Sequence, residues 1–90
     1  MKKVDLISAI ALKTGLPKVE VSEMIEAEME IISNTMAAGE NVYLRGFGTF
    51  LVKTRAEKLA RNIKANTTVV VPEHKIPAFK ASPEFINKFK

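Results

Sequence analysis

The sequence predicts an α+β fold, in which a helical hairpin is followed by β-strands and then by a short C-terminal helix. Two observations lead to this prediction. Up to Gly39 the apolar residues recur at helical spacing, whereas from Asn41 they follow the two-residue period of a strand. After the last strand, the motif Ser82-Pro83-Glu84 has the composition of a helix start.

Residues 1–39 are predicted to form the helical hairpin. The first helix runs from Val4 to Thr14, and Gly15 suits the left-handed residue that ends a helix. The chain restarts at Leu16-Pro17, because proline is tolerated in the first turn. The second helix carries an apolar stripe, which we assign to the core or a dimer interface, and a solvated acidic face. The stripe comprises Val21, Met24, Ile25, Met29, Ile32 and Met36, and the acidic face comprises Glu20, Glu23, Glu26 and Glu30.

A strand is predicted next, since Val42 and Leu44 face one way and Tyr43 and Arg45 the other. A second strand follows the turn Gly46-Phe47-Gly48. Glycines give this turn backbone freedom, and they let peptide N–H groups approach a phosphate without an intervening side chain. As a bare motif, Gly-x-Gly is more often only a turn.

Residues 54–75 have a composition that a compact domain does not explain. The outgoing limb, 55–61, has few large apolar residues, whereas the returning limb, 67–71, is strongly β-prone. Asn66 tolerates positive φ, so a hairpin that turns near Lys64-Ala65-Asn66 is predicted. By propensity alone, a helix over 55–61 is an equal alternative.

The C-terminal helix is predicted from three agreeing signals. Ser82 supplies a hydroxyl cap, Pro83 suits the first helical position, and Glu84 places an acid in the first turn. Its buried edge is predicted to comprise Phe85, Ile86 and Phe89.

Chain length predicts dimerisation. A chain of 90 residues forms one domain that buries only about 60 to 65% of its unfolded surface. If about twenty residues extend as an arm, the remaining ~70 approach the size at which oligomerisation is a common remedy.

Charge indicates a polyanionic partner. The net charge of +4 divides into −3 for residues 1–44 and +7 for residues 45–90. A concentrated basic field favours nucleic acid, because neutralised phosphates release counterions. An anionic membrane is disfavoured, since the basic half has no amphipathic helix of useful length. RNA is less favoured than duplex DNA, because the aromatic residues are not spaced for stacking on exposed bases.

The sequence contains few residues of the types that catalysis requires. Cysteine is absent and His74 is the only histidine, so no catalytic residue, metal site, cofactor or small-molecule substrate is expected. We assign His74 to an exposed strand or bend. Residues 1–5 have no apolar core long enough for a signal peptide and no apolar run of ~18 residues occurs, so a cytoplasmic protein is expected.

Two motifs that bracket a basic stretch resemble the HU family of small bacterial nucleoid proteins, which includes the integration host factors. They are Arg45-Gly46-Phe47-Gly48-Thr49-Phe50 and Ile76-Pro77-Ala78-Phe79-Lys80. The resemblance covers nearly the whole chain and implies an intertwined α+β homodimer, with helices beneath a β-saddle that carries two long β-ribbon arms. The implied single domain, 1–90, consists of a helical hairpin (1–39), saddle and arm (41–80, with the arm at about 54–75) and a C-terminal helix (82–90).

The resemblance also implies an architectural function. Such proteins bind duplex DNA through the minor groove with little sequence specificity, bend, compact or stabilise it, and prefer bent or nicked duplex. An apolar residue at each arm tip inserts between base pairs. Ile63 takes the place of the usual proline there, and since it lacks a locked φ, the tip is less preorganised. The implied location is the bacterial nucleoid in the cytoplasm.

The residues expected to touch DNA follow from the family pattern. Lys53, Arg55 and Arg61 share strand parity and so one face, whereas Lys58 needs a twist or bulge to reach the same groove. The DNA-binding set comprises Lys3, Gly46, Gly48, Lys53, Arg55, Lys58, Arg61, Asn62, Ile63, Lys64, Lys75 and Lys80, with Ile63 as the intercalating residue. The implied dimer core comprises Phe47, Phe50 and Phe79.

Two other functions remain open at this point. One is a site-preferring bending factor like the integration host factors, which usually pair two different chains. The other is a basic module that binds an acidic protein by strand addition. A second, related subunit in the purified complex supports the first, and a salt-independent affinity for duplex DNA supports the second.

Overall fold

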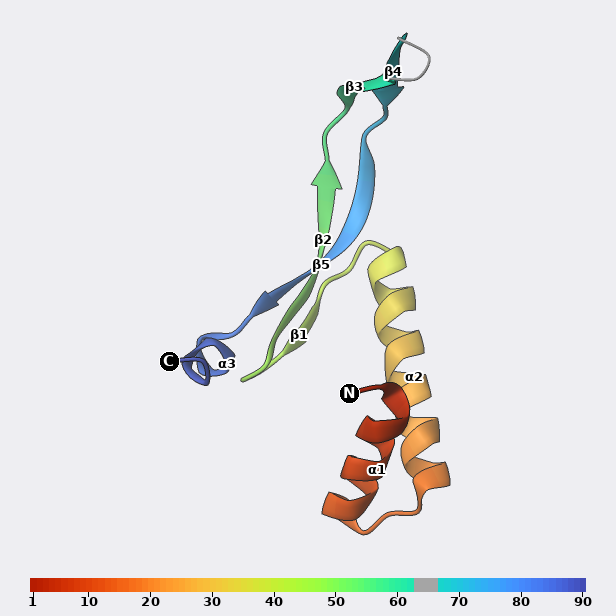
Figure 1. Ribbon diagram of the computed structural model, residues 1–90, viewed down its shortest axis with the longest axis vertical. Coiled ribbons are helices and arrows are strands. Elements are labelled where there is room, and N and C mark those ends of the chain that lie inside the picture. Colours follow the sequence, from red (N-terminus) through yellow and green to blue (C-terminus); the bar gives the residue numbers. More distant parts are fainter. Residues whose placement is uncertain (63–66) are drawn as a thin grey trace. The chain divides into compact units, whose positions relative to one another are not determined.

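The computed structural model describes residues 1–62 and 67–90, which divide into two compact units, Met1–Asn34 and Thr35–Lys90 (Figure 1). The order of elements follows the predicted α+β pattern. The elements are α1 (Lys3–Thr14), α2 (Lys18–Ala37), β1 (Val42–Leu44), β2 (Gly48–Arg55), β3 (Lys58–Asn62), β4 (Thr67–Val71), β5 (His74–Ala81) and α3 (Pro83–Asn87).

The first unit is the predicted helical hairpin of α1 and most of α2. Gly15 ends α1 in the left-handed conformation, with φ of 75°, and its N–H donates to the Ala11 carbonyl at 2.9 Å. In the predicted stripe of α2, Val21 and Ile25 are buried, but Met24 and Met29 are exposed. The hydrophobic core of a single chain is therefore small.

The second unit contains a three-stranded antiparallel sheet in the order β1-β2-β5. The predicted turn joins β1 to β2, with Gly46 at φ of 82° and the Phe47 N–H donating to the Leu44 carbonyl at 3.0 Å. At the edge, the Asn41 Oδ1 atom accepts from the Val52 N–H at 3.0 Å. Side-chain and backbone hydrogen bonds together thus fix the path of the chain into β2.

Beyond this sheet, β2 and β5 lead into the two-stranded antiparallel pair β3 and β4, which forms the predicted ribbon (Figure 1). The helical alternative for residues 55–61 is wrong, because Lys58–Asn62 pairs with Thr67–Val71. Long-range strand pairing overrides the helix propensity of the outgoing limb. The predicted tip at residues 63–66 lies outside the described residues.

The pairing is interrupted between the β2–β5 ladder and the β3–β4 ladder. It stops after Arg55 and His74 and resumes with Lys58 and Val71, so each strand leaves two residues unpaired. Pro72 lies in this gap and has no N–H to donate to a ladder. Because both strands skip the same number of residues, the register continues unchanged and no bulge is inserted.

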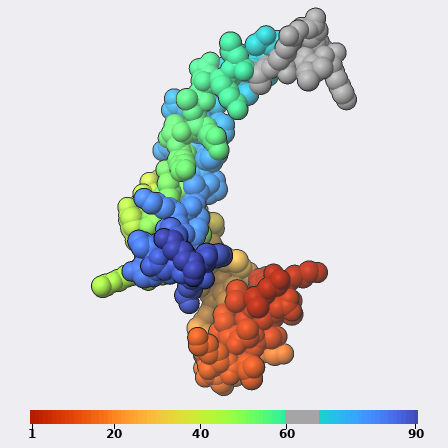
Figure 2. Space-filling model, turned by 60° about the vertical axis from the view of Figure 1, so that its left-hand side comes forward, coloured from red at the N-terminus to blue at the C-terminus, as the bar shows by residue number. Residues whose placement is uncertain are grey.

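The C-terminal helix α3 starts where predicted. The Ser82 Oγ atom accepts from the Phe85 N–H at 3.2 Å, and Pro83 occupies the first turn. In Figure 2 the C-terminal residues, in dark blue, lie at the three-stranded sheet, where the Phe85 ring is near Phe47 and Phe79. The predicted buried edge is corrected, because only Phe85 is half-buried, whereas Ile86 and Phe89 are exposed. A helix of five residues presents too little surface to bury all three side chains against its own chain.

Candidate nucleic-acid interface

The strand register separates the side chains of β2 and β5 onto two faces. Cross-strand partners share a face, and successive residues alternate between faces. Phe50 pairs with Phe79, which places the aromatic residues on one face. Three pairs of the opposite parity define what we call the cationic face: Thr49 with Lys80, Lys53 with Ile76, and Arg55 with His74.

The aromatic face holds the residues assigned to the dimer core. Ring centroids are 4.9 Å apart for Phe50 and Phe79, and 5.2 Å apart for Phe47 and Phe79. Phe85 joins this cluster, 5.1 Å from Phe47. From the sequence, Phe85 is expected only on the buried edge of the C-terminal helix, although the predicted helix start at Ser82 already places it near the end of the preceding strand. Phe47 and Phe79 remain 45% and 41% exposed, so the cluster offers apolar area to a partner.

The two glycines of the turn have different surroundings. Gly46 is exposed and open, with nothing within 4 Å of an added Cβ. Gly48 is buried, and an added Cβ would lie 2.5 Å from the Lys80 carbonyl oxygen and 2.5 Å from the Phe79 ring. The structure therefore gives Gly48 a packing role, and its contact with DNA stays a prediction.

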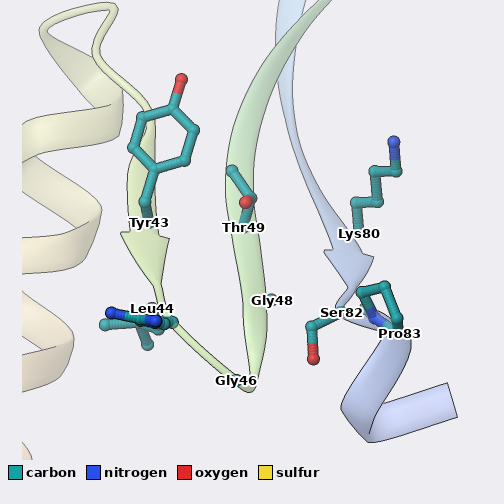
Figure 3. Close-up of a pocket in the computed structure, with 10 residues that line it drawn as sticks. Tyr43, Leu44, Gly46, Gly48, Thr49, Lys80, Ser82 and Pro83 are labelled. Carbon is teal, nitrogen blue, oxygen red and sulfur yellow. The ribbon is translucent and has the colours of Figure 1, made fainter. Parts of the chain in front are cut away.

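A hollow of about 380 Å³ lies beside the turn, across the end of the sheet where β2 lies between β1 and β5. Its lining includes Tyr43, Arg45, Gly46, Lys80 and Ser82. Figure 3 shows Tyr43 and Lys80 on the outer strands, with Thr49 between them. Two cations and several hydroxyl groups suit an anion such as phosphate. Sequence reasoning omitted Tyr43 and Arg45 from the site, although their shared parity was visible.

Three predicted lysines are not among the residues that define the cationic face. The Lys3 Nζ atom forms an ion pair with the Glu26 carboxylate in the first unit. Lys75 pairs with Thr54, on the parity opposite to Lys53, and its Nζ atom lies near Gly39, 4.0 Å from where a Cβ would be. Lys58 also keeps that opposite parity, because the register holds no bulge. The structure thus brings together Lys53, Arg55 and Lys80 on one face and places Lys58 and Lys75 on the opposite parity.

The remaining predicted residues lie in or beyond the outer ribbon. The backbones of Arg61 and Asn62 pair with Thr68 and Thr67 in the β3–β4 ladder. Ile63 and Lys64 lie outside the described residues.

Other kinds of site find no support in the described residues. Over 1–62 and 67–90, no group of three His, Asp or Glu side chains is placed to hold a metal ion. Among the helices of the same ranges, none has the length and apolar character needed to cross a bilayer.

Comparison with known proteins identifies the family. The family model described as "Bacterial DNA-binding protein" matches residues 1–90. The DNA-binding protein HU of Staphylococcus aureus is 43% identical over 81 residues, which are 90% of each chain. HU-beta of Pseudomonas aeruginosa is 40% identical over the same shares.

Solved structures agree with this result. The Anabaena HU–DNA cocrystal structure superposes with a TM-score of 0.94 at 32% identity, covering 99% of this chain and 97% of that one. HU from Thermotoga maritima gives a TM-score of 0.71 at 27% identity, with full coverage of both chains. From its sequence and its fold alike, the chain belongs to the HU family of bacterial DNA-binding proteins.

Proposed function

We propose that this protein is an architectural nucleoid protein, which binds duplex DNA with little sequence specificity and bends, compacts or stabilises it. The observation that carries the proposal is the separation of side chains onto the two faces of the β2–β5 pair. Lys53, Arg55 and Lys80 share one face with an exposed hollow, while the phenylalanine cluster occupies the other. One face can therefore meet phosphates while the other packs against protein.

The functional unit in this proposal is a homodimer in which each chain contributes one arm. Two observations support it: the small core of the single chain and the half-exposed aromatic cluster. A second copy that covers Phe47 and Phe79 adds the apolar burial that a chain of this size needs. We include the whole chain, 1–90, in one domain, because the family model spans it. The proposed location is the bacterial nucleoid, in the cytoplasm.

Contact with the minor groove is assigned to the arms, and the apolar wedge to Ile63. A ribbon is narrow enough to follow a groove, and an apolar wedge repays the cost of unstacking by exposing more duplex to the protein. The Anabaena relative was crystallised with DNA, which supports duplex DNA as the ligand.

A binding titration tests the function. Fluorescence anisotropy should be measured on linear, nicked and pre-bent duplexes of one sequence, each at two salt concentrations. We expect the tightest binding to the nicked and pre-bent duplexes, with a slope of log K against log[salt] of about −0.9 for each neutralised phosphate. Salt-independent binding, or no binding to any duplex, contradicts the proposal.

The wedge has its own test in Ile63→Ala. Removing the apolar side chain should weaken bending of an intact duplex, measured by energy transfer between its ends, far more than binding to a nicked duplex. A nick already relieves the stacking that the wedge must break, so it supplies the control. Equal losses on the two substrates contradict the wedge.

A further inference from the structure

We propose that His74 is a further DNA-contacting residue of the cationic face, and that it contacts phosphate only when its imidazole is protonated. The inference rests on the proposed function and deepens it, since it adds a pH-dependent contact to the same surface. The structure confirms that His74 is an exposed strand residue, and the proposal adds a binding role that the sequence did not assign to it.

His74 lies opposite Arg55 on the cationic face. His74 is the first residue of β5 and pairs directly with Arg55 of β2. Cross-strand partners lie about 4.5 to 5.5 Å apart on one face, so a phosphate held by Arg55 lies within reach of the imidazole. Both residues are exposed. A histidine at this register position therefore lies among the cations that are proposed to meet DNA.

One ring nitrogen of His74 is engaged by a backbone carbonyl, which determines the role of the other nitrogen. The His74 Nδ1 atom lies 2.9 Å from the Pro72 carbonyl oxygen. A carbonyl oxygen can only accept, so Nδ1 must carry a proton and donate it. In the neutral ring the other nitrogen, Nε2, then holds a lone pair and can only accept. No hydrogen bond involving Nε2 is found among the described residues.

Protonation turns Nε2 from a hydrogen-bond acceptor into a donor. Neutral Nε2 cannot bond a phosphate oxygen, because both would be acceptors. When Nε2 takes up a proton, it becomes a charged donor, and charge-assisted hydrogen bonds to phosphate are stronger than neutral ones. Acidification that protonates the ring should therefore create this contact.

The charges around His74 favour coupling between the proton and DNA. Arg55 faces the ring across the sheet, and exposed cations and acids flank it on both strands. The cations are Lys53, Lys58 and Lys75, and the acids are Glu57 and Glu73 in the unpaired gap. A bound phosphate adds negative charge beside the ring, so DNA binding is expected to favour the protonated form of His74.

The test compares wild type with His74→Gln and His74→Lys. Anisotropy titrations on one nicked duplex at pH 5.5 and 7.5, at constant ionic strength, give the affinity. For a dimer with two such histidines we expect wild-type affinity to rise on the order of three- to tenfold on acidification, beyond any change in the glutamine variant. The salt slope of wild type should steepen by about two over the same interval, at 0.9 for each added phosphate contact. The lysine variant should bind as tightly at pH 7.5 as wild type does at pH 5.5.

A second readout is proton uptake. Calorimetric titration at pH 6.5, in two buffers of different ionisation enthalpy, should show net protons taken up with DNA by wild type and not by His74→Gln. Equal pH responses and equal proton uptake in the two proteins overturn the role of His74 while leaving the proposed function intact. Absence of duplex binding at both pH values overturns the proposed function itself. Far-ultraviolet circular dichroism of each variant confirms that the compared proteins are folded.

Discussion

At the scale of the residue, Gly48 shows how closely the sheet packs on its aromatic face. Its Cα is approached by both the Lys80 backbone and the Phe79 ring, so no side chain fits there. Gly46, only two residues away, has open space and is constrained by its positive φ instead. The same motif thus contains one glycine required by packing and one required by backbone conformation.

Gly48→Ala should therefore destabilise the protein. An added methyl group meets backbone at 2.5 Å, which cannot be relieved by rotating a side chain. We expect the free energy of unfolding, from urea denaturation, to fall by about 1 to 3 kcal/mol. Gly46→Asn is the matched control, because asparagine tolerates positive φ and the site is open, so it should cost less. Equal losses in both variants contradict the packing role.

The ion pair between Lys3 and Glu26 leads to a second residue-scale prediction. The two side chains are 49% and 54% exposed, so the pair contributes only about 0 to 1 kcal/mol to stability. It also holds a lysine that is expected to touch phosphate. Glu26→Gln should release Lys3 and raise duplex affinity about two- to fivefold, with little change in stability.

Glu30→Gln is the matched control, since it removes the same charge from an exposed position on the same helix. Anisotropy titrations at low salt compare the two variants with wild type. If both raise the affinity equally, the effect comes from net charge, and the Lys3 pair has no special part in it.

At the scale of the element, Ser82 determines where α3 begins. Its Oγ atom accepts from the Phe85 N–H, and the helix carries Phe85 onto the aromatic cluster. Ser82→Ala should lower the free energy of unfolding by about 0.5 to 2 kcal/mol, measured in urea. Ser82→Asp keeps a capping oxygen and should retain most of the stability; a loss as large as that of alanine contradicts the capping role.

Local signals were sufficient to predict most elements. Gly15 and Gly39 mark helix ends through their backbone preference, Ser82 marks a helix start through its side-chain cap, and the two-residue period from Val42 indicated the first strands. The limb 55–61 stayed undecided, because its conformation depends on pairing with residues distant in sequence. Strand parity had already placed Lys58 opposite Lys53, and the register confirms this, whereas the face of Lys75 followed only from the observed register.

At the scale of the whole molecule, one chain buries little apolar side-chain area. Only Val21 and Ile25 are buried hydrophobic residues within the described ranges, while Phe47 and Phe79 are half-exposed and Phe89 is 80% exposed. Stability must then be linked to association, because a partner that binds only the folded chain shifts the folding equilibrium by mass action.

This predicts that the midpoint of thermal unfolding rises with protein concentration. Phe47→Ala removes a ring that contacts both Phe79 and Phe85, so it should weaken the dimer at least tenfold in sedimentation equilibrium. Leu59→Ala is the control, since Leu59 is an equally apolar but 70% exposed residue of the ribbon. A wild-type midpoint that is independent of concentration contradicts the linkage.

The paired two-residue gap in the ribbon has a mechanical consequence. Ladder bonds stop at Arg55 and His74 and restart at Lys58 and Val71 with the count of residues preserved on both strands. Bending costs least where no backbone hydrogen bond must stretch, so the β3–β4 hairpin can tilt at this gap. Because both strands skip the same number of residues, the register continues and each side chain keeps its face. Each arm can therefore follow a curved groove with the same face toward it.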